Sequence, residues 1–211
     1  MNDDPGELPL AVLARAQELG FLGPGPIDAQ RAHAEGFGEV VERTLDAAPD
    51  SLVDLGSGGG VPGLVLAARW PSCRVALVDS NHRRCDLLQA VVVEQGWADR
   101  VEVVEARAEV VAREPRCRER FRVATARGLA GPAATAELAA GFVTVGGVLV
   151  VSDPPEPEAE RWPSAGLAAF GFGSAVRSTV RSGSFVAIRK ISSAPENVPR
   201  GVGRPAKRPR W

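Results

Sequence analysis

Residues 52–63 read Leu-Val-Asp-Leu-Gly-Ser-Gly-Gly-Gly-Val-Pro-Gly, and this stretch decides the fold. A short apolar run ends at Asp54 and Leu55, a glycine cluster follows, and Pro62 fits the first turn of a helix. Glycine adopts positive φ angles and lets a ligand approach the backbone. The helix N-terminus behind the loop offers free N–H groups and a positive dipole end. The order strand, glycine loop, helix therefore predicts a loop that binds a nucleotide cofactor.

Two cofactors fit such a loop. Residues 58–63 match the G-x-G-x-x-G spacing of dinucleotide-binding loops, which many glycine-rich turns satisfy. Residues 54–60, an acidic residue followed by G-x-G, are similar to motif I of methyltransferases that use S-adenosylmethionine (SAM). A carboxylate at the strand end suits the cationic SAM and would repel a pyrophosphate. We therefore expect SAM, ahead of a dinucleotide or a turn without a ligand. The expected contacts of the loop are Asp54, Gly56, Ser57, Gly58 and Gly60.

A second acidic residue ends the next buried-type strand. The run Arg74-Val-Ala-Leu-Val-Asp79 follows the loop by about 20 residues, which is the spacing of a ribose-binding carboxylate. We expect Asp79 and the adjoining Ser80 at a ribose. The alternative role for Asp79 is that of a helix N-cap for the segment starting near Asn81. This spacing serves SAM and NAD equally, so it indicates a nucleoside without choosing the cofactor.

The bulk properties indicate one α/β domain. The chain has 211 residues, of which 45% are hydrophobic, enough for one buried core. Its three cysteines, Cys73, Cys85 and Cys117, lie at no metal-ligand spacing, so we expect reduced thiols and no metal site. The acidic start at Met1 is unlike a signal peptide, and the longest apolar run, about residues 139–151, is short for a membrane span. We expect a cytoplasmic protein without a membrane contact.

Strand and helix patterns alternate from Ser51 onward. Strands are expected at 51–55, 74–79, 100–104, 121–126 and 146–152, with helices at about 62–70, 81–96, 107–113 and 131–141. This alternation predicts a doubly wound, mostly parallel, Rossmann-like α/β sheet. Residues 168–178 and 184–191 predict a C-terminal antiparallel hairpin, which is typical of the SAM-methyltransferase fold. A NAD-type fold would end in another parallel strand.

Three regions are expected along the chain. Residues 1–48 form an N-terminal helical cap with helices at 9–20 and 27–48, residues 49–192 form the methyltransferase domain, and residues 193–211 form a basic, proline-rich tail. From Arg189 to Trp211 there are seven Lys and Arg residues and one Glu, which indicates a polyanionic partner. A solvated, disordered terminus is the alternative, and the prolines at 199, 205 and 209 argue against a helix there. Trp211 is expected either to stack on a base or to dock on the protein itself.

The glycine loop continues into Val61-Pro-Gly-Leu64. With Asp79-Ser80 and Arg83, this stretch resembles the bacterial small-subunit (16S) ribosomal RNA guanine-N7 methyltransferases, also called the glucose-inhibited division protein B family. Similar segments follow the third strand, the fourth strand and the terminal hairpin. They are Arg107-Ala-Glu109, residues 126–130 and residues 198–209. The resemblance runs from about residue 30 to the end of the chain.

The resemblance implies SAM-dependent methyl transfer to guanine N7 of ribosomal RNA, in the 30S subunit or its precursor. It implies that Gly56 and Val61 line the methionine side of SAM and that Ala108 and Glu109 lie along the adenine. Arg127 would lie where cofactor and base meet. Because guanine N7 has a free lone pair, no general base is needed, and Arg127 is the one candidate catalytic residue. The residues expected to bind RNA phosphates are Arg200, Arg204, Lys207 and Arg208. Removing the chain after Ile191 is expected to weaken RNA binding and to spare SAM binding.

The chain departs from the family pattern in two places. The family usually has a Trp-Asn…Asn-Leu-Thr stretch where residues 21–28 read Phe-Leu-Gly-Pro-Gly-Pro-Ile-Asp. It usually has Leu-Lys-Gly after the fifth strand, where this chain has Asp153-Pro-Pro-Glu. A lysine would favour an RNA phosphate, whereas Asp153 would not. Because of these departures, two alternative functions stay open. The chain could be a methyltransferase that acts on a small molecule or a protein, or a non-catalytic homologue that binds SAM or RNA. Nothing in the sequence indicates an oligomeric state.

Overall fold

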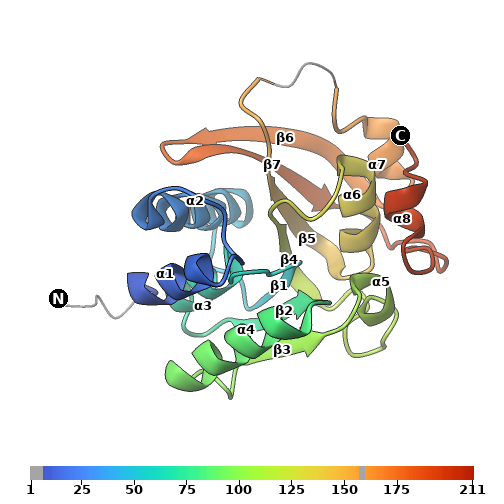
Figure 1. Cartoon of the computed structure of the whole chain (residues 1–211). Coiled ribbons are helices and arrows are strands. Elements are labelled where there is room, and N and C mark those ends of the chain that lie inside the picture. Colours follow the sequence, from blue (N-terminus) through green and yellow to red (C-terminus); the bar gives the residue numbers. More distant parts are fainter. Residues whose placement is uncertain (1–6, 157–159) are drawn as a thin grey trace.

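One seven-stranded sheet, in the order β3-β2-β1-β4-β5-β7-β6, forms the centre of the molecule (Figure 1). The computed structural model describes residues 7–156 and 160–211. The strands are β1 (Ser51–Leu55), β2 (Arg74–Asp79), β3 (Val101–Glu105), β4 (Phe121–Ala126), β5 (Val143–Ser152), β6 (Phe172–Val180) and β7 (Gly183–Lys190). Strands β1 to β5 are parallel, and β7 is antiparallel to both β5 and β6. This order confirms the predicted doubly wound sheet with its antiparallel hairpin.

Helices cover both faces of this sheet (Figure 1). They are α1 (Leu10–Glu18), α2 (Ile27–Leu45), α3 (Gly63–Arg69), α4 (His82–Glu94), α5 (Ala108–Val111), α6 (Pro132–Ala140), α7 (Ser164–Ala168) and α8 (Arg204–Lys207). Since side chains alternate along a strand, Leu52 and Leu77 face the core under α1 to α4, whereas Val53 and Val78 face the core under α5 to α7. Helices α1 and α2 therefore share one core with the sheet.

The C-terminal third differs from the prediction in two elements. Residues 164–168 form α7, and β6 begins only at Phe172, so the predicted strand start at Ala168 is wrong. A helix of five residues is too short to display helical periodicity in its sequence. Likewise, α8 forms in the tail in spite of Pro205, because that proline lies in the first turn, where its missing N–H is not needed.

The register brings four strand ends to one edge. Leu55 pairs with Val78 on one side and with Ala126 on the other, and Asp79 pairs with Glu105. Because β1 lies between β2 and β4, the strand order reverses beside the glycine loop. Ligands of open α/β sheets bind outside the carboxyl ends of the strands at such a switch point.

Candidate functional site

Two adjoining hollows lie at the carboxyl ends of the strands. One, of about 210 Å³, is lined by the glycine loop, residues 21–23 and Arg127. The other, of about 200 Å³, is lined by Asp79 and the start of α5. Gly56, Arg84 and Gly128 line both hollows, so the two form one crevice, called here the cofactor crevice.

Most of the predicted cofactor residues line this crevice. Those that do are Gly56, Ser57, Gly58, Val61, Asp79, Ser80, Ala108, Glu109 and Arg127. Asp54 and Gly60 are not among its lining residues. The topology therefore gathers residues from β1, β2, β4 and α5 that lie far apart in the sequence.

Asp54 lies beneath the loop and outside the crevice. Its residue surface is 1% exposed, and its carboxylate accepts hydrogen bonds from the Thr125 hydroxyl at 2.8 Å and the Gly63 N–H at 3.2 Å. Burial raises the pKa of Asp54 to about 6, although these hydrogen bonds act in the opposite direction. The expectation that this carboxylate faces a cationic ligand is therefore corrected. The Asp54 carboxylate links β1 to β4 and to the start of α3. These hydrogen bonds fix both ends of the glycine loop, which runs from β1 to α3.

Two glycines of the loop have no room for a side chain. Gly60 has φ +90°, and a Cβ atom there would overlap the Leu64 side chain. A Cβ atom at Gly59 would lie 2.9 Å from the carbonyl oxygen of Phe21. The turn after α1 therefore packs directly on the glycine loop, and this contact brings the N-terminal cap to the crevice.

Asp79 holds the loop from the other side. Its Oδ2 accepts a hydrogen bond from the Gly58 N–H at 2.9 Å, and its Oδ1 accepts one from the Asn81 N–H at 2.9 Å. A carboxylate offers about four acceptor positions, so both oxygens can accept a further donor. Arg84 Nη1 lies 3.6 Å from Oδ2. Asp79 can therefore bind ribose hydroxyls while it orders the loop. Asn81, whose side chain accepts from the Arg84 N–H, is the N-cap of α4.

Arg127 enters the crevice at the end of β4. Its Nη2 donates a hydrogen bond to Gln30 Oε1 on α2, whereas its buried Nη1 has no partner among the described residues. Burial lowers the pKa of Arg127, although Arg is charged throughout the physiological range. A charged N–H without a protein acceptor fits an acceptor oxygen on a bound molecule.

Neither histidine is placed as a general base. His33 packs between Phe37 and Phe185, with ring centroids 5.7 Å and 5.0 Å away. Burial and then the charge of Arg127 lower the pKa of His33. His82 is exposed, and its Nδ1 lies 2.9 Å from Glu105 Oε2. The ring contacts of His33 are those of a packing residue.

The basic tail is only partly available to a polyanion. Arg200 forms an ion pair with Glu137 at 2.6 Å, and the buried Lys190 Nζ donates to the Ala140 carbonyl oxygen at 2.6 Å. The assignment of Arg200 to RNA phosphates is therefore corrected, because its guanidinium is engaged inside the protein. Arg204, Lys207 and Arg208 are exposed. The Trp211 indole docks on the protein, with Nε1 donating to the Arg161 carbonyl oxygen at 3.2 Å.

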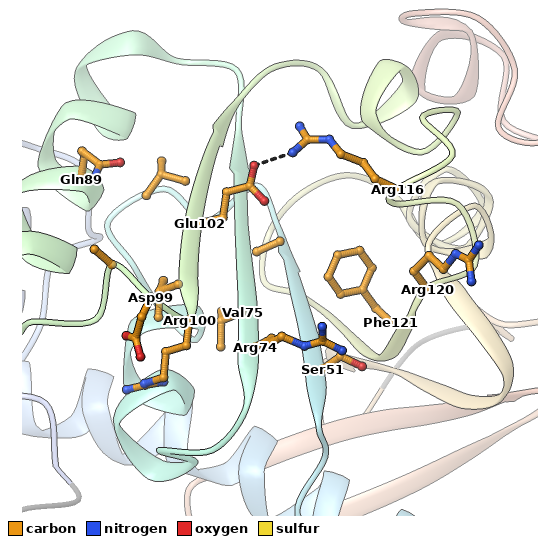
Figure 2. Close-up of a pocket in the computed structure, with 14 residues that line it drawn as sticks. Ser51, Arg74, Val75, Gln89, Asp99, Arg100, Glu102, Arg116, Arg120 and Phe121 are labelled. Carbon is orange, nitrogen blue, oxygen red and sulfur yellow. Dashed lines mark hydrogen bonds and ion pairs between the residues drawn. The ribbon is translucent and has the colours of Figure 1, made fainter.

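A larger hollow, of about 690 Å³, lies at the opposite edge of the sheet (Figure 2). It is lined by the amino ends of β1 to β4, including Ser51, Arg74 and Phe121. Arg116, on its wall, is paired with Glu102 at 2.7 Å (Figure 2). None of the predicted site residues line this hollow, and it lies away from the switch point. We therefore assign the candidate site to the smaller cofactor crevice.

A family comparison agrees with this geometry. The model of the GidB family, described as rRNA small subunit methyltransferase G, matches residues 39–161. The chain belongs to this family. Family and fold together identify a SAM-dependent methyltransferase.

Relatives and solved structures support the assignment. A protein named ribosomal RNA small subunit methyltransferase G from Roseiflexus castenholzii is 36% identical over 170 residues, covering 76% of this chain and 71% of its own. One of the same name from Dehalococcoides mccartyi is 31% identical over 168 residues, covering 76% and 71%. A methyltransferase structure from Geobacter sulfurreducens has a TM-score of 0.63 at 17% identity, with 91% of each chain covered. At that identity the structural likeness shows the fold alone.

One departure from the family pattern has a local explanation. The Asp153 carboxylate is fully buried, and Arg161 and Arg177 donate to it at 2.8 Å and 2.7 Å. Its charge is therefore neutralised by two arginines. The acidic residue does not present a bare negative charge where the family usually has a lysine.

Several lining residues escaped the sequence analysis. They are Phe21, Leu22, Gly23, Arg84, Leu129, Leu138, Pro205 and Ala206. Arg84 had a local signal, since it lies in the first turn of the helix that follows the strand-end acid Asp79. Phe21 and Ala206 had none, because their contacts with the crevice come from distant parts of the chain. Within the described residues, no helix combines the length and apolarity that a membrane span requires, and no cluster of metal-ligating side chains occurs.

Proposed function

We propose that this chain transfers the methyl group of SAM to guanine N7 of small-subunit (16S) ribosomal RNA. The observation that carries the proposal is the cofactor crevice. It joins the glycine loop to an arginine, Arg127, whose buried Nη1 has no hydrogen-bond partner within residues 7–156 and 160–211. Family membership supports the RNA substrate, since relatives carry names that describe this reaction class. We further propose that the acceptor is the 30S subunit or its precursor, in the cytoplasm.

The residues of the crevice fit the three parts of SAM. The glycine loop and Val61 would hold the methionine part, Asp79 and Ser80 the ribose, and Ala108 with Glu109 the adenine. When bound, SAM supplies a methyl group on a sulfonium, which an aromatic ring nitrogen can displace in line. In this proposal Asp54 acts through the loop and is a positioning residue.

The protein's contribution would be alignment and not proton transfer. The N7 lone pair of guanine is free at neutral pH, so the chain needs to hold two reactants in line and exclude water. Such alignment can lower a barrier by about 7–11 kcal/mol. A target base inside a helix would first be extruded from its stack.

Arg127 would select guanine. The oxygen O6 lies beside N7 on guanine and accepts hydrogen bonds, whereas adenine carries an amino donor at the same place. We propose that the Arg127 guanidinium donates to O6, which leaves the N7 lone pair directed at the methyl group. Exposed Arg204, Lys207 and Arg208 would contact phosphates without reading sequence.

Transfer of labelled methyl groups tests the proposal. The protein is incubated with methyl-labelled SAM and 30S subunits that lack the modification, and RNA is separated from protein before counting. We expect label in 16S RNA. Gly58→Asp provides the control. An aspartate at this position, where φ is +55°, would strain the loop and bring a second carboxylate close to Asp79, so we expect it to abolish SAM binding. Label only in protein or in small molecules would favour another acceptor, and SAM binding without any transfer would favour a non-catalytic homologue.

A further inference from the structure

The C-terminal segment, residues 198–208, packs beside the adenine end of the cofactor crevice. Pro205 and Ala206 line the second hollow together with Ala108, Leu129 and Leu138. Pro205 is buried, whereas Ala206 is exposed on the rim. The tail that the charge pattern indicated as an RNA arm thus contributes an apolar surface to the crevice.

Two of the contacts that hold this segment in place are made by buried glutamates. Glu137 of α6 is fully buried and accepts hydrogen bonds from the Arg200 backbone N–H at 2.8 Å and from its guanidinium at 2.6–3.1 Å. Further along, the Gly203 N–H donates to Glu109 Oε1 at 2.8 Å. Burial opposes ionisation of Glu109, yet hydrogen bonds from Arg107 and Gly203 prevail and lower its pKa. Glu109 therefore links the segment after β3 to the tail.

The geometry points to a cofactor-binding role for the C-terminal segment: Pro205 and Ala206 form the outer wall of the adenine slot. A purine ring is flat and apolar on its faces. Small and aliphatic side chains form one part of the lining of this hollow, and charged side chains, among them Arg107 and Glu109, form another part. Asp79, on the same hollow, would meet the adjoining ribose. The inference rests on the proposed use of SAM. It also revises the expectation for a protein cut after Ile191, which would lose SAM affinity as well as RNA affinity.

Ala206→Leu tests this wall with the full chain. Ala206 is exposed, so a larger side chain leaves the core untouched but occupies part of the slot. The matched control is Ala165→Leu, at an exposed alanine of α7 away from the crevice. Isothermal titration with SAM is expected to give a Kd about tenfold higher for Ala206→Leu and unchanged for the control. A Kd for Ala206→Leu within about threefold of wild type would overturn the inference.

A second measurement requires no substitution. Hydrogen exchange of the wild-type protein is followed at the amides of residues 203, 204 and 206–208 with and without saturating SAM. Slower exchange with SAM is expected. Unchanged exchange would contradict the inference that this segment forms a wall of the adenine slot. If the wild-type protein does not bind SAM at all, the proposed function itself fails, and that outcome is distinct from normal binding by Ala206→Leu.

Discussion

Gly60 occupies a position that only glycine fills without strain. Gly60→Ala would force a left-handed backbone onto alanine and press its Cβ atom into Leu64. We expect the free energy of unfolding to fall by about 3 kcal/mol. The control is Gly96→Ala, where φ is +68° but no atom lies within 4 Å of the added Cβ. That variant should lose only about 1 kcal/mol, and equal losses in urea titrations would contradict the packing argument.

Asp54 should make stability depend on pH. Because burial raises its folded pKa to about 6 from the unfolded 3.8, the folded protein binds the proton more tightly. The associated stabilisation is complete below about pH 4 and is lost as the pH rises through 6. Between pH 4 and 7, the wild-type free energy of unfolding should fall by about 2–3 kcal/mol relative to Asp54→Asn. If the free energy of unfolding of the two proteins changed with pH in the same way, the raised pKa of the buried Asp54 would be refuted.

Arg127 should matter more for transfer than for cofactor binding. In Arg127→Gln, loss of a charged donor to the guanine is expected to slow single-turnover methylation by about ten- to a hundredfold. The SAM Kd should stay within about threefold of wild type, because the loop and Asp79 are unchanged. If Arg127→Gln lowered the SAM affinity and the methylation rate by the same factor, Arg127 would contribute only to cofactor binding.

The ion pair between Arg200 and Glu137 anchors the start of the C-terminal segment. Arg200→Ala would leave Glu137 buried without its charged partner, and we expect a loss of about 3 kcal/mol of stability by chemical denaturation. Adding Glu137→Leu should restore part of it, since the uncompensated charge is then gone. The control is Arg116→Ala, which removes an exposed pair with Glu102 and should change stability little. No recovery in the double variant would argue against the pair as the anchor.

Elements with long, regular patterns could be predicted from the sequence. The strands β1, β2 and β4 and the helix α4 are encoded by local runs of apolar residues, and their bounds were predicted to within two residues. The short helices α7 and α8 carry no such signal, because four or five residues show no period. For the site, residues next to the strand ends were predicted from topology. Pro205 and Phe21 were not, since only tertiary packing brings them to the crevice.

At the scale of the whole molecule, the cofactor crevice and the larger hollow lie at opposite ends of the strands. The cofactor crevice opens at the carboxyl ends of the strands, and its lining includes the turn after α1, the end of β4 and the C-terminal segment. The larger, arginine-lined hollow lies at the amino ends, across the length of the sheet (Figure 2). Exposed Arg204 and Lys207 flank the adenine wall, so RNA phosphates would bind beside the cofactor. RNA affinity should therefore fall with salt, in proportion to the phosphates contacted.

The position of the methyl group on the RNA tests the central claim most directly. After incubation of unmodified 30S subunits with SAM and the protein, 16S RNA is reduced with borohydride and treated with aniline, which cleaves the chain at 7-methylguanosine. The account predicts a new cleavage at one guanine, absent without SAM and absent with Gly58→Asp. Label in 16S RNA without any cleavage at a guanine would contradict methyl transfer to N7.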